Sequence, residues 1–133
     1  MQVRVPVSVG ELLDKISILE IKAQRIEDRS KRENVDRELA LLRKAWDEVQ
    51  VPADSGSEVE RLRMELRAVN EELWEIEDRI REKEADGVFD DEFIELARSV
   101  YLTNDRRARL KKDLNLLLGS DLVEEKSYAS YGR

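Results

Sequence analysis

The sequence contains no cysteine and no histidine among its 133 residues. Without them the chain has no disulfide, no thiolate nucleophile and no imidazole acid or base. The zinc, haem and di-iron sites that proteins usually build also need one of these two residue types. We therefore expect no metal ion and no cofactor, so any chemistry has to rest on Asp, Glu, Lys, Arg, Tyr and Ser side chains.

Glycine, proline and aromatic residues are scarce, and long hydrophobic runs are missing. The chain has 5 glycines, 2 prolines and 5% aromatic residues, whereas hydrophobic and charged residues each make up 41%. This composition is typical of long solvated helices. No run approaches the roughly 20 apolar residues that span a bilayer, and the start MQVRVPVSVG lacks the continuous apolar segment of a signal peptide. We predict no membrane insertion and a cytoplasmic location.

Positive charge is also in deficit, since the formal net charge is -7. A negative protein is poorly suited to nucleic acid or to an anionic membrane surface. The one basic run, residues 106–112, has no aromatic residues between its cations, and its leucine continues a helical stripe. A charged helical face is the commoner explanation of such a run, so we predict no nucleic-acid binding.

Residues 1–8 alternate valine with polar residues or proline, which is typical of a short extended arm. Ser8 and Glu11 then have the spacing of a capping box, in which each side chain accepts a hydrogen bond from a free amide at a helix start. Apolar residues follow at intervals of three and four. The pattern predicts a first helix from Val9 to near Arg29.

The capping-box spacing recurs at Ser30 and Glu33, and apolar residues again follow at intervals of three and four. A second helix is therefore predicted, so that residues 9–50 form a helical hairpin. Residues 51–57 concentrate proline, glycine and small polar residues, which favours a loop between two halves of the chain.

A third helix is predicted from Ser57 and Glu60, which repeat the capping-box spacing. Its apolar residues keep a strict alternation of three and four, the pattern of a left-handed coiled coil. Gly87 supplies its stop. With a fourth helix starting around residue 90, residues 58–118 form a long coiled-coil-like hairpin.

The apolar stripe of the fourth helix is interrupted by Thr103 and Arg107. Polar groups at such positions indicate a local break in the helix, a buried polar contact, or a point at which the helix leaves the core. Beyond this helix, residues 119–133 carry no periodic pattern and are predicted to form an irregular tail.

We predict a single all-α domain over residues 1–133, an antiparallel bundle of about four helices with a short extended N-terminal arm. At 1.5 Å per residue, the two later helices reach about 42 Å and the two earlier ones about 30 Å. The longer hairpin should therefore extend past the shorter one. Because exposed apolar surface usually finds cover, we predict a homodimer built along the long hairpin.

The first helix offers one candidate site. Lys15 and Lys22 lie on the same side of it as Ser8 and Glu11, which predicts a small charged pocket against another helix. The alternative is that Glu11 and Lys15 form an exposed pair four residues apart, which contributes only a few tenths of a kcal/mol.

A second candidate site is a row of polar residues along the fourth helix, three of them spaced seven apart. The row consists of Arg98, Tyr101, Asn104, Asp105, Arg106 and Lys112. Arg and Lys donate to phosphate or carboxylate groups, and Asp can orient them, so the row predicts a site for a small anionic ligand. A ladder of solvated charges is the alternative.

The tail carries Glu125, Lys126 and Tyr128, which combine a carboxylate, an amine and a phenol. These groups would complete a site if the tail folds back over the fourth helix as a lid. A frayed terminus of ordinary composition is the alternative.

Four segments carry a family resemblance: SVGELLDKISILEIK, ELWEIEDRIR, FIELARSVYLTNDRRARLK and LLGSDLVEEKSY. They resemble an uncharacterised family of short bacterial helical proteins and attached domains, which has only a domain-of-unknown-function name. The likeness extends over nearly the whole chain. It implies no established reaction.

A partial likeness concerns residues 62–76, which resemble the first helix of the helical chorismate mutases. That family performs its chemistry with Arg, Lys, Glu and Gln and needs neither Cys nor His. Its second arginine would fall at or beside Arg79, and the lysine and the Asp-x-x-Arg-Glu pattern that should follow are missing here. Any heptad helix would reproduce the part that matches.

Our leading hypothesis from the sequence is a helical interaction module without enzymatic activity that holds a partner protein or a small anionic ligand. The alternative is a small metal-independent enzyme or a ligand sensor for a phosphorylated or carboxylated metabolite, with Asp105 or Glu125 as the base. A cavity of several hundred Å³ between the first helix, the fourth helix and the tail would favour the alternative. A flat and filled surface would favour the module.

Overall fold

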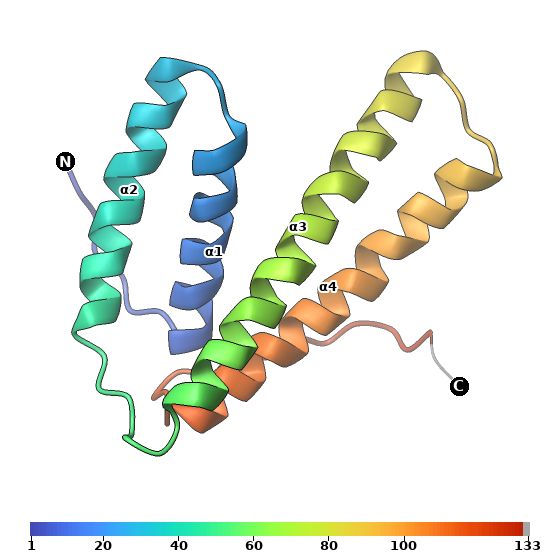
Figure 1. The fold of residues 1–133 in the computed structure, drawn as a ribbon. Coiled ribbons are helices and arrows are strands. Elements are labelled where there is room, and N and C mark those ends of the chain that lie inside the picture. Colours follow the sequence, from blue (N-terminus) through green and yellow to red (C-terminus); the bar gives the residue numbers. More distant parts are fainter. Residues whose placement is uncertain (132–133) are drawn as a thin grey trace.

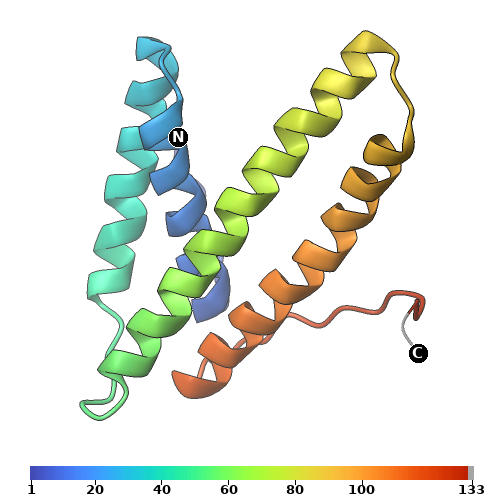
Figure 2. The ribbon, with the colours of Figure 1, turned by 45° about the vertical axis from the view of Figure 1, so that its right-hand side comes forward.

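A computed structural model describes residues 1–131, and within them the chain is all-α. The helices are α1 (Val9–Arg25), α2 (Arg29–Asp47), α3 (Gly56–Asp86) and α4 (Asp91–Leu117). They form two antiparallel hairpins that meet where α1 and α3 begin and diverge toward their other ends (Figures 1 and 2). The predicted helical fold with a long second hairpin and an extended arm is confirmed.

The start of α1 and the junction between α3 and α4 lie where the sequence places them. Ser8 Oγ accepts a hydrogen bond from the backbone N–H of Glu11 at 3.1 Å. Gly87 ends α3 in the left-handed conformation, with φ of 66°, which a residue with a Cβ adopts only at a cost. Asp90 Oδ1 then accepts from the N–H of Phe93 at 3.0 Å and begins α4.

The predicted boundary between the first two helices is wrong. Helix α1 ends at Arg25, and Asp28 caps α2 by accepting from the N–H of Lys31 at 2.9 Å. Asp caps a helix as well as Ser does, and Asp28 comes two residues before the predicted cap, Ser30. Ser30 therefore lies inside the first turn of α2.

The predicted start of α3 is also wrong by a short distance. The helix begins at Gly56 with Ser55 in the capping position, where its side chain makes no capping hydrogen bond. Ser57 thus lies inside the helix. Ser55 N–H instead donates to the carbonyl of Pro52 at 2.9 Å, so a turn of the preceding loop runs directly into α3.

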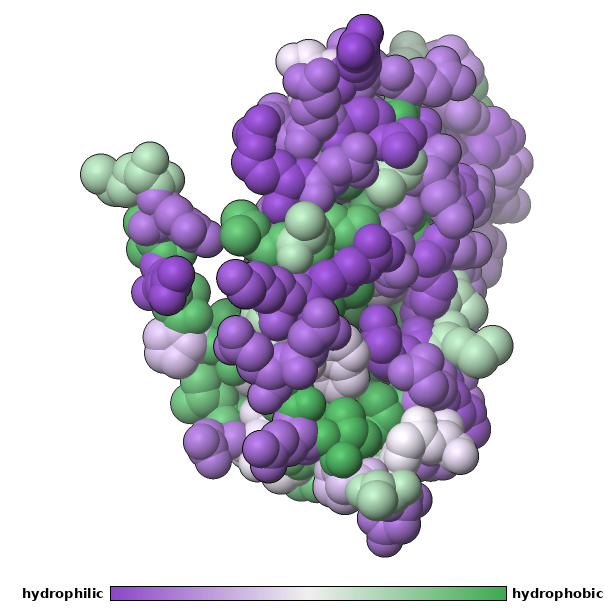
Figure 3. Space-filling view, turned by 60° about the vertical axis from the view of Figure 1, so that its left-hand side comes forward, coloured by the Kyte–Doolittle hydropathy of each residue, from purple (hydrophilic) through white to green (hydrophobic). Residues whose placement is uncertain are grey.

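Helix α1 lies at the centre of the arrangement and packs against all three other helices, whereas the backbone of α2, within residues 1–131, approaches that of α1 alone. One apolar cluster joins the four helices. Its buried members are Leu12, Leu13, Ile16, Leu19, Val35, Leu39, Val59, Leu62, Leu66 and Leu114. The outer face of α2 is charged, and Figure 3 shows a largely hydrophilic surface on this side.

Helices α3 and α4 have 31 and 27 residues, against 17 and 19 for α1 and α2. Their far ends point away from the first hairpin, as Figure 1 shows, and Phe89, Ile94 and Leu102 are exposed there. None of the helices described in residues 1–131 has a stretch apolar and long enough to cross a bilayer.

The predicted interruption of α4 is a buried polar contact and not a break. The helix runs without interruption from Asp91 to Leu117. Thr103 is buried, and Arg107 reaches across to a carboxylate of α1. Of the three alternatives that the sequence left open, the structure thus shows the buried polar contact.

Candidate functional site

The start of α1 lies unusually close to the end of α4. A Cβ added to Gly10 would clash with the backbone carbonyl of Lys111, so only glycine permits this approach. The N–H of Gly10 donates to Asn115 Oδ1 at 2.6 Å, and the N–H of Val9 donates to Ser120 Oγ at 3.1 Å. Two amides that a helix start leaves free are thus satisfied by Asn115 of α4 and by Ser120, which follows this helix.

A buried ion pair joins the same two helices one turn further along. Asp14 is 0% exposed. Arg107 Nε donates to its two carboxylate oxygens at 3.0 and 3.1 Å, and Nη2 donates to Oδ2 at 2.5 Å. From α3, Asn70 Nδ2 donates to Asp14 Oδ1 at 2.8 Å and to Ser17 Oγ at 3.2 Å. A buried carboxylate with this many donors is fully paired.

The guanidinium of Arg107 is fixed by this pair but keeps one edge free for other contacts. Burial, the largest single influence, would lower the pKa of Arg107, but the hydrogen bonds to Asp14 together with the negative charges of Asp14, Glu11 and Glu124 raise it. Nη1, which does not bond to Asp14, points toward Asn104 Oδ1 at 3.4 Å. Asp14 therefore positions a permanent positive charge on the surface of α4.

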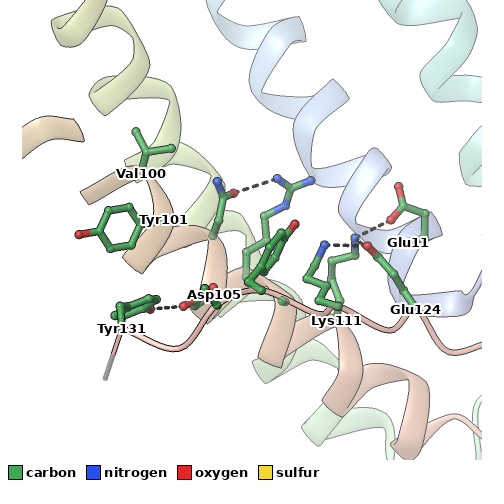
Figure 4. Close-up of a pocket in the computed structure, with 13 residues that line it drawn as sticks. Glu11, Val100, Tyr101, Asp105, Lys111, Glu124 and Tyr131 are labelled. Atoms are coloured by element: carbon green, nitrogen blue, oxygen red, sulfur yellow. Dashed lines mark hydrogen bonds and ion pairs between the residues drawn. The ribbon is translucent and has the colours of Figure 1, made fainter. Parts of the chain in front are cut away.

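Lys111, one turn after Arg107, forms the second cation of the site and is 7% exposed. Its Nζ donates to Glu11 Oε2 at 2.5 Å and to Glu124 Oε2 at 3.0 Å, and it lies 3.8 Å from Asp14 Oδ2. Burial, the largest single influence, disfavours the charged amine, but the hydrogen bonds to Glu11 and Glu124 together with the charges of Asp14 and Glu11 raise the pKa of Lys111. Figure 4 shows the carboxylates of Glu11, from α1, and Glu124, from the tail, at the amine of Lys111 on α4.

Glu124 holds the tail, residues 118–131, against α4. Its carboxylate spans two amines, with Oε2 3.0 Å from Lys111 Nζ and Oε1 2.7 Å from Lys126 Nζ. The hydrogen bonds from Lys126 and Lys111 lower the pKa of Glu124 from its ordinary 4.5 to about 2. The carboxylate is therefore ionised at any pH near neutral.

A cavity of about 620 Å³ opens between α4, the start of α1 and the tail, and we call it the tail cavity. Six charged side chains are among those that line it: Glu11, Asp105, Arg107, Lys111, Glu124 and Lys126. At the end away from Lys111, the hydroxyl of Tyr131 donates to Asp105, and the Tyr131 and Tyr101 rings pack with their centroids 5.1 Å apart (Figure 4). This is the size of cavity that holds a small molecule.

The structure brings together five of the residues that the sequence singled out. These residues, which line the tail cavity, are Tyr101, Asn104, Asp105, Lys126 and Tyr128. Of the two alternatives that the sequence left open for the tail, the structure has the one in which the tail folds back over α4. Glu125 lies in the tail as well, but it lines a smaller neighbouring hollow of about 180 Å³ with Lys126.

The remaining predicted residues lie elsewhere. Arg98 pairs with Glu95 within α4, as the alternative of a solvated ladder proposed. Arg106 pairs with Glu72 of α3, and both Arg106 and Lys112 line a separate shallow groove between α3 and α4.

The two lysines of α1 also lie outside the tail cavity. Lys15 is exposed and 3.8 Å from Glu11, so the exposed-pair alternative describes it. Lys22 lies in the last turn of α1.

Sequence reasoning left the residues at the centre of the site, Asp14, Arg107 and Lys111, out of its candidate site residues, although it noted Arg107 as a polar interruption of the apolar stripe. A usable signal was present. Glu11 and Asp14 are three residues apart on one helix, and Arg107 and Lys111 are four apart on another, so two antiparallel helices can pair them one to one. Among residues 1–131 there is no group of three or more carboxylates placed to hold a metal ion.

Taken together, the fold and the site define a small all-helical domain whose tail covers a charged cavity. Comparison with known families then places the chain: it belongs to the Family of unknown function (DUF6165), whose sequence profile matches residues 3–131. The predicted membership in an uncharacterised family is confirmed. None of the curated proteins and none of the solved structures matches the chain. The likeness to chorismate mutases gains no support from these comparisons.

Proposed function

We propose that the chain binds a small ligand carrying a carboxylate or phosphate group in the tail cavity. The observation that carries the proposal is the position of the Glu124 carboxylate, which bridges Lys111 Nζ at 3.0 Å and Lys126 Nζ at 2.7 Å. Charge-assisted hydrogen bonds of this kind are the ones that an external carboxylate or phosphate makes in a binding site. Glu124 therefore marks where the anionic group of a ligand would lie.

The charges around Lys111 agree with this reading. Three positive groups oppose three negative ones: Arg107, Lys111 and Lys126 against Glu11, Asp14 and Glu124. When the Glu124 carboxylate moves aside, Lys111 and Lys126 lose the acceptor that they share, and this group of charges is one negative charge short. A ligand with one negative charge restores the balance, whereas a neutral ligand leaves a cation unpaired.

The cavity also bears on the choice between the two hypotheses from the sequence. Its volume of about 620 Å³ supports the ligand-binding alternative more than a module with a flat, filled docking face. The carboxylates that line it are engaged, Glu11 and Glu124 by Lys111 and Asp105 by Tyr131. The geometry thus supports binding of an anion, and we propose a ligand-binding or sensing role.

A thermal-shift screen of carboxylates and phosphates tests the proposal, because a ligand that binds only the folded chain raises the unfolding temperature. The decisive comparison uses two exposed lysines. Lys126→Ala removes an amine that contacts the Glu124 carboxylate, and Lys44→Ala removes an exposed amine in the last turn of α2, away from the tail cavity. We expect at least a fivefold weaker affinity for the first variant and an unchanged affinity for the second. Equal affinities in the two variants, or no binding anion in the screen, would overturn the proposal.

We also propose that the chain forms a homodimer along its long hairpin. The far half of this hairpin extends beyond α1 and α2 and exposes Phe89, Ile94 and Leu102. Apolar side chains grouped in this way often mark an interface between subunits. Size-exclusion chromatography with light scattering at micromolar concentration should give twice the mass of the chain, and the mass of a monomer would reject the dimer.

A further inference from the structure

All three tyrosines of the chain line the tail cavity. Tyr101 comes from α4, whereas Tyr128 and Tyr131 come from the tail, so the folding of the tail onto α4 is what gathers them. The other aromatic residues lie away from this cavity: the two tryptophans contact arginines on other helices, and the two phenylalanines pack on each other at the α3–α4 junction.

The three rings are accessible although they lie in a hollow. Tyr101, Tyr131 and Tyr128 are 43%, 55% and 75% exposed. The Tyr101 and Tyr131 rings are inclined at 60° with their centroids 5.1 Å apart, and the Tyr131 hydroxyl is held by Asp105. Lys126 Nζ lies 5.9 Å from the centroid of the Tyr128 ring, so this tyrosine lies next to the amines. Accessible aromatic faces in a cavity are suited to stacking against a ring of the ligand.

The cavity thus has two chemically different ends. Lys111, Lys126 and Glu124 meet at one end, while Tyr101, Tyr131 and Asp105 meet at the other, as Figure 4 shows. Inorganic phosphate or acetate would use the first end and leave most of the 620 Å³ unoccupied. A ligand that uses both ends needs an anionic group and a flat apolar ring.

We propose that the ligand is an aromatic anion, that is, an aromatic or heteroaromatic ring bearing a carboxylate or phosphate group. Its anionic group takes the position of the Glu124 carboxylate, and its ring packs against Tyr101, Tyr128 and Tyr131. This inference rests on the proposed binding of an anion in the same cavity and adds the part of the ligand that the anion site does not determine.

Ring-carbon-labelled tyrosine makes the test direct, since three tyrosines give three sets of NMR signals and all three report on this cavity. The probes are 2-naphthoate, its fully saturated counterpart decahydro-2-naphthoate, and inorganic phosphate. We expect naphthoate to shift the tyrosine signals through its ring current. It should bind about three- to tenfold more tightly than the saturated acid, the preference that an aromatic pair provides.

Substitutions of single aromatic residues test whether the preference for naphthoate arises in the tail cavity. Tyr131→Leu removes a ring from the tail without touching the helical core, and Tyr101→Leu removes its neighbour on α4. Either change should abolish the preference for naphthoate over the saturated acid while binding of phosphate remains. Phe89→Leu serves as the control, because it removes an equally exposed ring at the far end of the long hairpin, and it should leave the preference unchanged.

Two results separate the inference from the proposed function. If phosphate and both carboxylates bind and the aromatic and saturated acids do so equally well, the anion site stands and the aromatic inference is overturned. If none of the three probes binds, and Lys126→Ala and Lys44→Ala also behave alike in the anion screen, both are overturned.

Discussion

Helix α1 has two stripes that differ in kind. Toward α2 it presents Leu12, Ile16 and Leu19, which share an apolar cluster with Val35 and Leu39. The other stripe carries Gly10, Asp14 and Ser17, which make hydrogen bonds and an ion pair with α4 and α3. The first interface holds two helices together, while the second also determines where charged groups lie.

The difference shows what the polar interface is for. Burying an ion pair removes two charges from water, and apolar residues of similar volume would often give equal or greater stability. We therefore expect the Asp14–Arg107 pair to stabilise the fold no more than two leucines at the same positions would. What it does provide is position, because it fixes one edge of Arg107 and sets Lys111 one turn away on the wall of the cavity.

The largest expected effect comes from breaking this pair on one side. Arg107→Ala leaves the Asp14 carboxylate buried with Asn70 as its main donor, and we expect the free energy of unfolding to fall by about 3–5 kcal/mol. Urea denaturation followed by circular dichroism measures it. A loss under 1 kcal/mol would show that Asp14 reaches water and that the interface is not the dry one described above.

A double variant, Asp14→Leu with Arg107→Leu, is the matched experiment. We expect its free energy of unfolding to lie within about 1 kcal/mol of that of the natural chain, because both buried charges are removed together. We also expect it to lose affinity for anions in the tail cavity. A double variant that keeps its affinity would contradict the positioning role of the pair.

In the apolar interface between α1 and α2, the variant Leu39→Ala on α2 should lower the free energy of unfolding by about 2–4 kcal/mol, because it leaves a cavity in the packed cluster. Leu41→Ala, on the exposed face of α2, is the control and should change the free energy of unfolding by less than about 0.5 kcal/mol. Neither variant should alter anion binding measured by calorimetry. A weaker affinity in folded Leu39→Ala would mean that the two interfaces of α1 are not independent.

Gly10→Ala tests the close approach of α1 to α4. The added methyl group meets the carbonyl of Lys111, so the helix must shift, at a cost of about 1–3 kcal/mol. Gly56→Ala places its methyl group in open space, so it should be neutral or stabilise the chain by about 0.5 kcal/mol. Thermal unfolding of the two variants compares them directly, and equal melting temperatures would argue against the tight contact.

The smallest effect concerns the tail. The pKa of Glu124 is about 2 in the docked tail and 4.5 ordinarily, so docking is fully supported above pH 4.5 and weakens as the pH falls toward 2. Tyrosine NMR signals should report release of the tail over this range, and Glu124→Gln should remove that transition. At neutral pH the same variant should bind anions about two- to fivefold more tightly, because it removes the carboxylate that competes with the ligand for Lys111 and Lys126, a competition of about 0.5–1 kcal/mol.

Local signals in the sequence predict local structure well where one candidate stands alone. Ser8 at the start of α1, Gly87 at the end of α3 and Asp90 before α4 all act as their residue types predict. Ser30 failed because Asp28, an equally good cap, precedes it. Propensity does not decide between two adjacent caps, since the position of the whole helix in the fold does.

The site could be predicted only in part, for a similar reason. Asp14 and Arg107 are 93 residues apart, and the matched spacing of the two pairs of charges permits the register that brings them together without selecting it from others. Exposed Arg98 and buried Lys111 both look like ordinary charges on a helix. The tail residues Lys126 and Tyr128 were selected because the tail combines carboxylates, an amine and a phenol, but nothing in the sequence distinguishes Glu124 from Glu125 as the carboxylate that contacts Lys111.

The hydrogen bond from Val9 N–H to Ser120 Oγ brings the start of α1 beside the end of α4, so the four helices form a nearly closed circuit. A circularly permuted chain, with residue 120 linked to residue 8 and new ends placed in the loop between α2 and α3, should keep all four helices. Such a chain lacks residues 121–131 in their place over α4. It would separate the folding of the helical body from the building of its cavity.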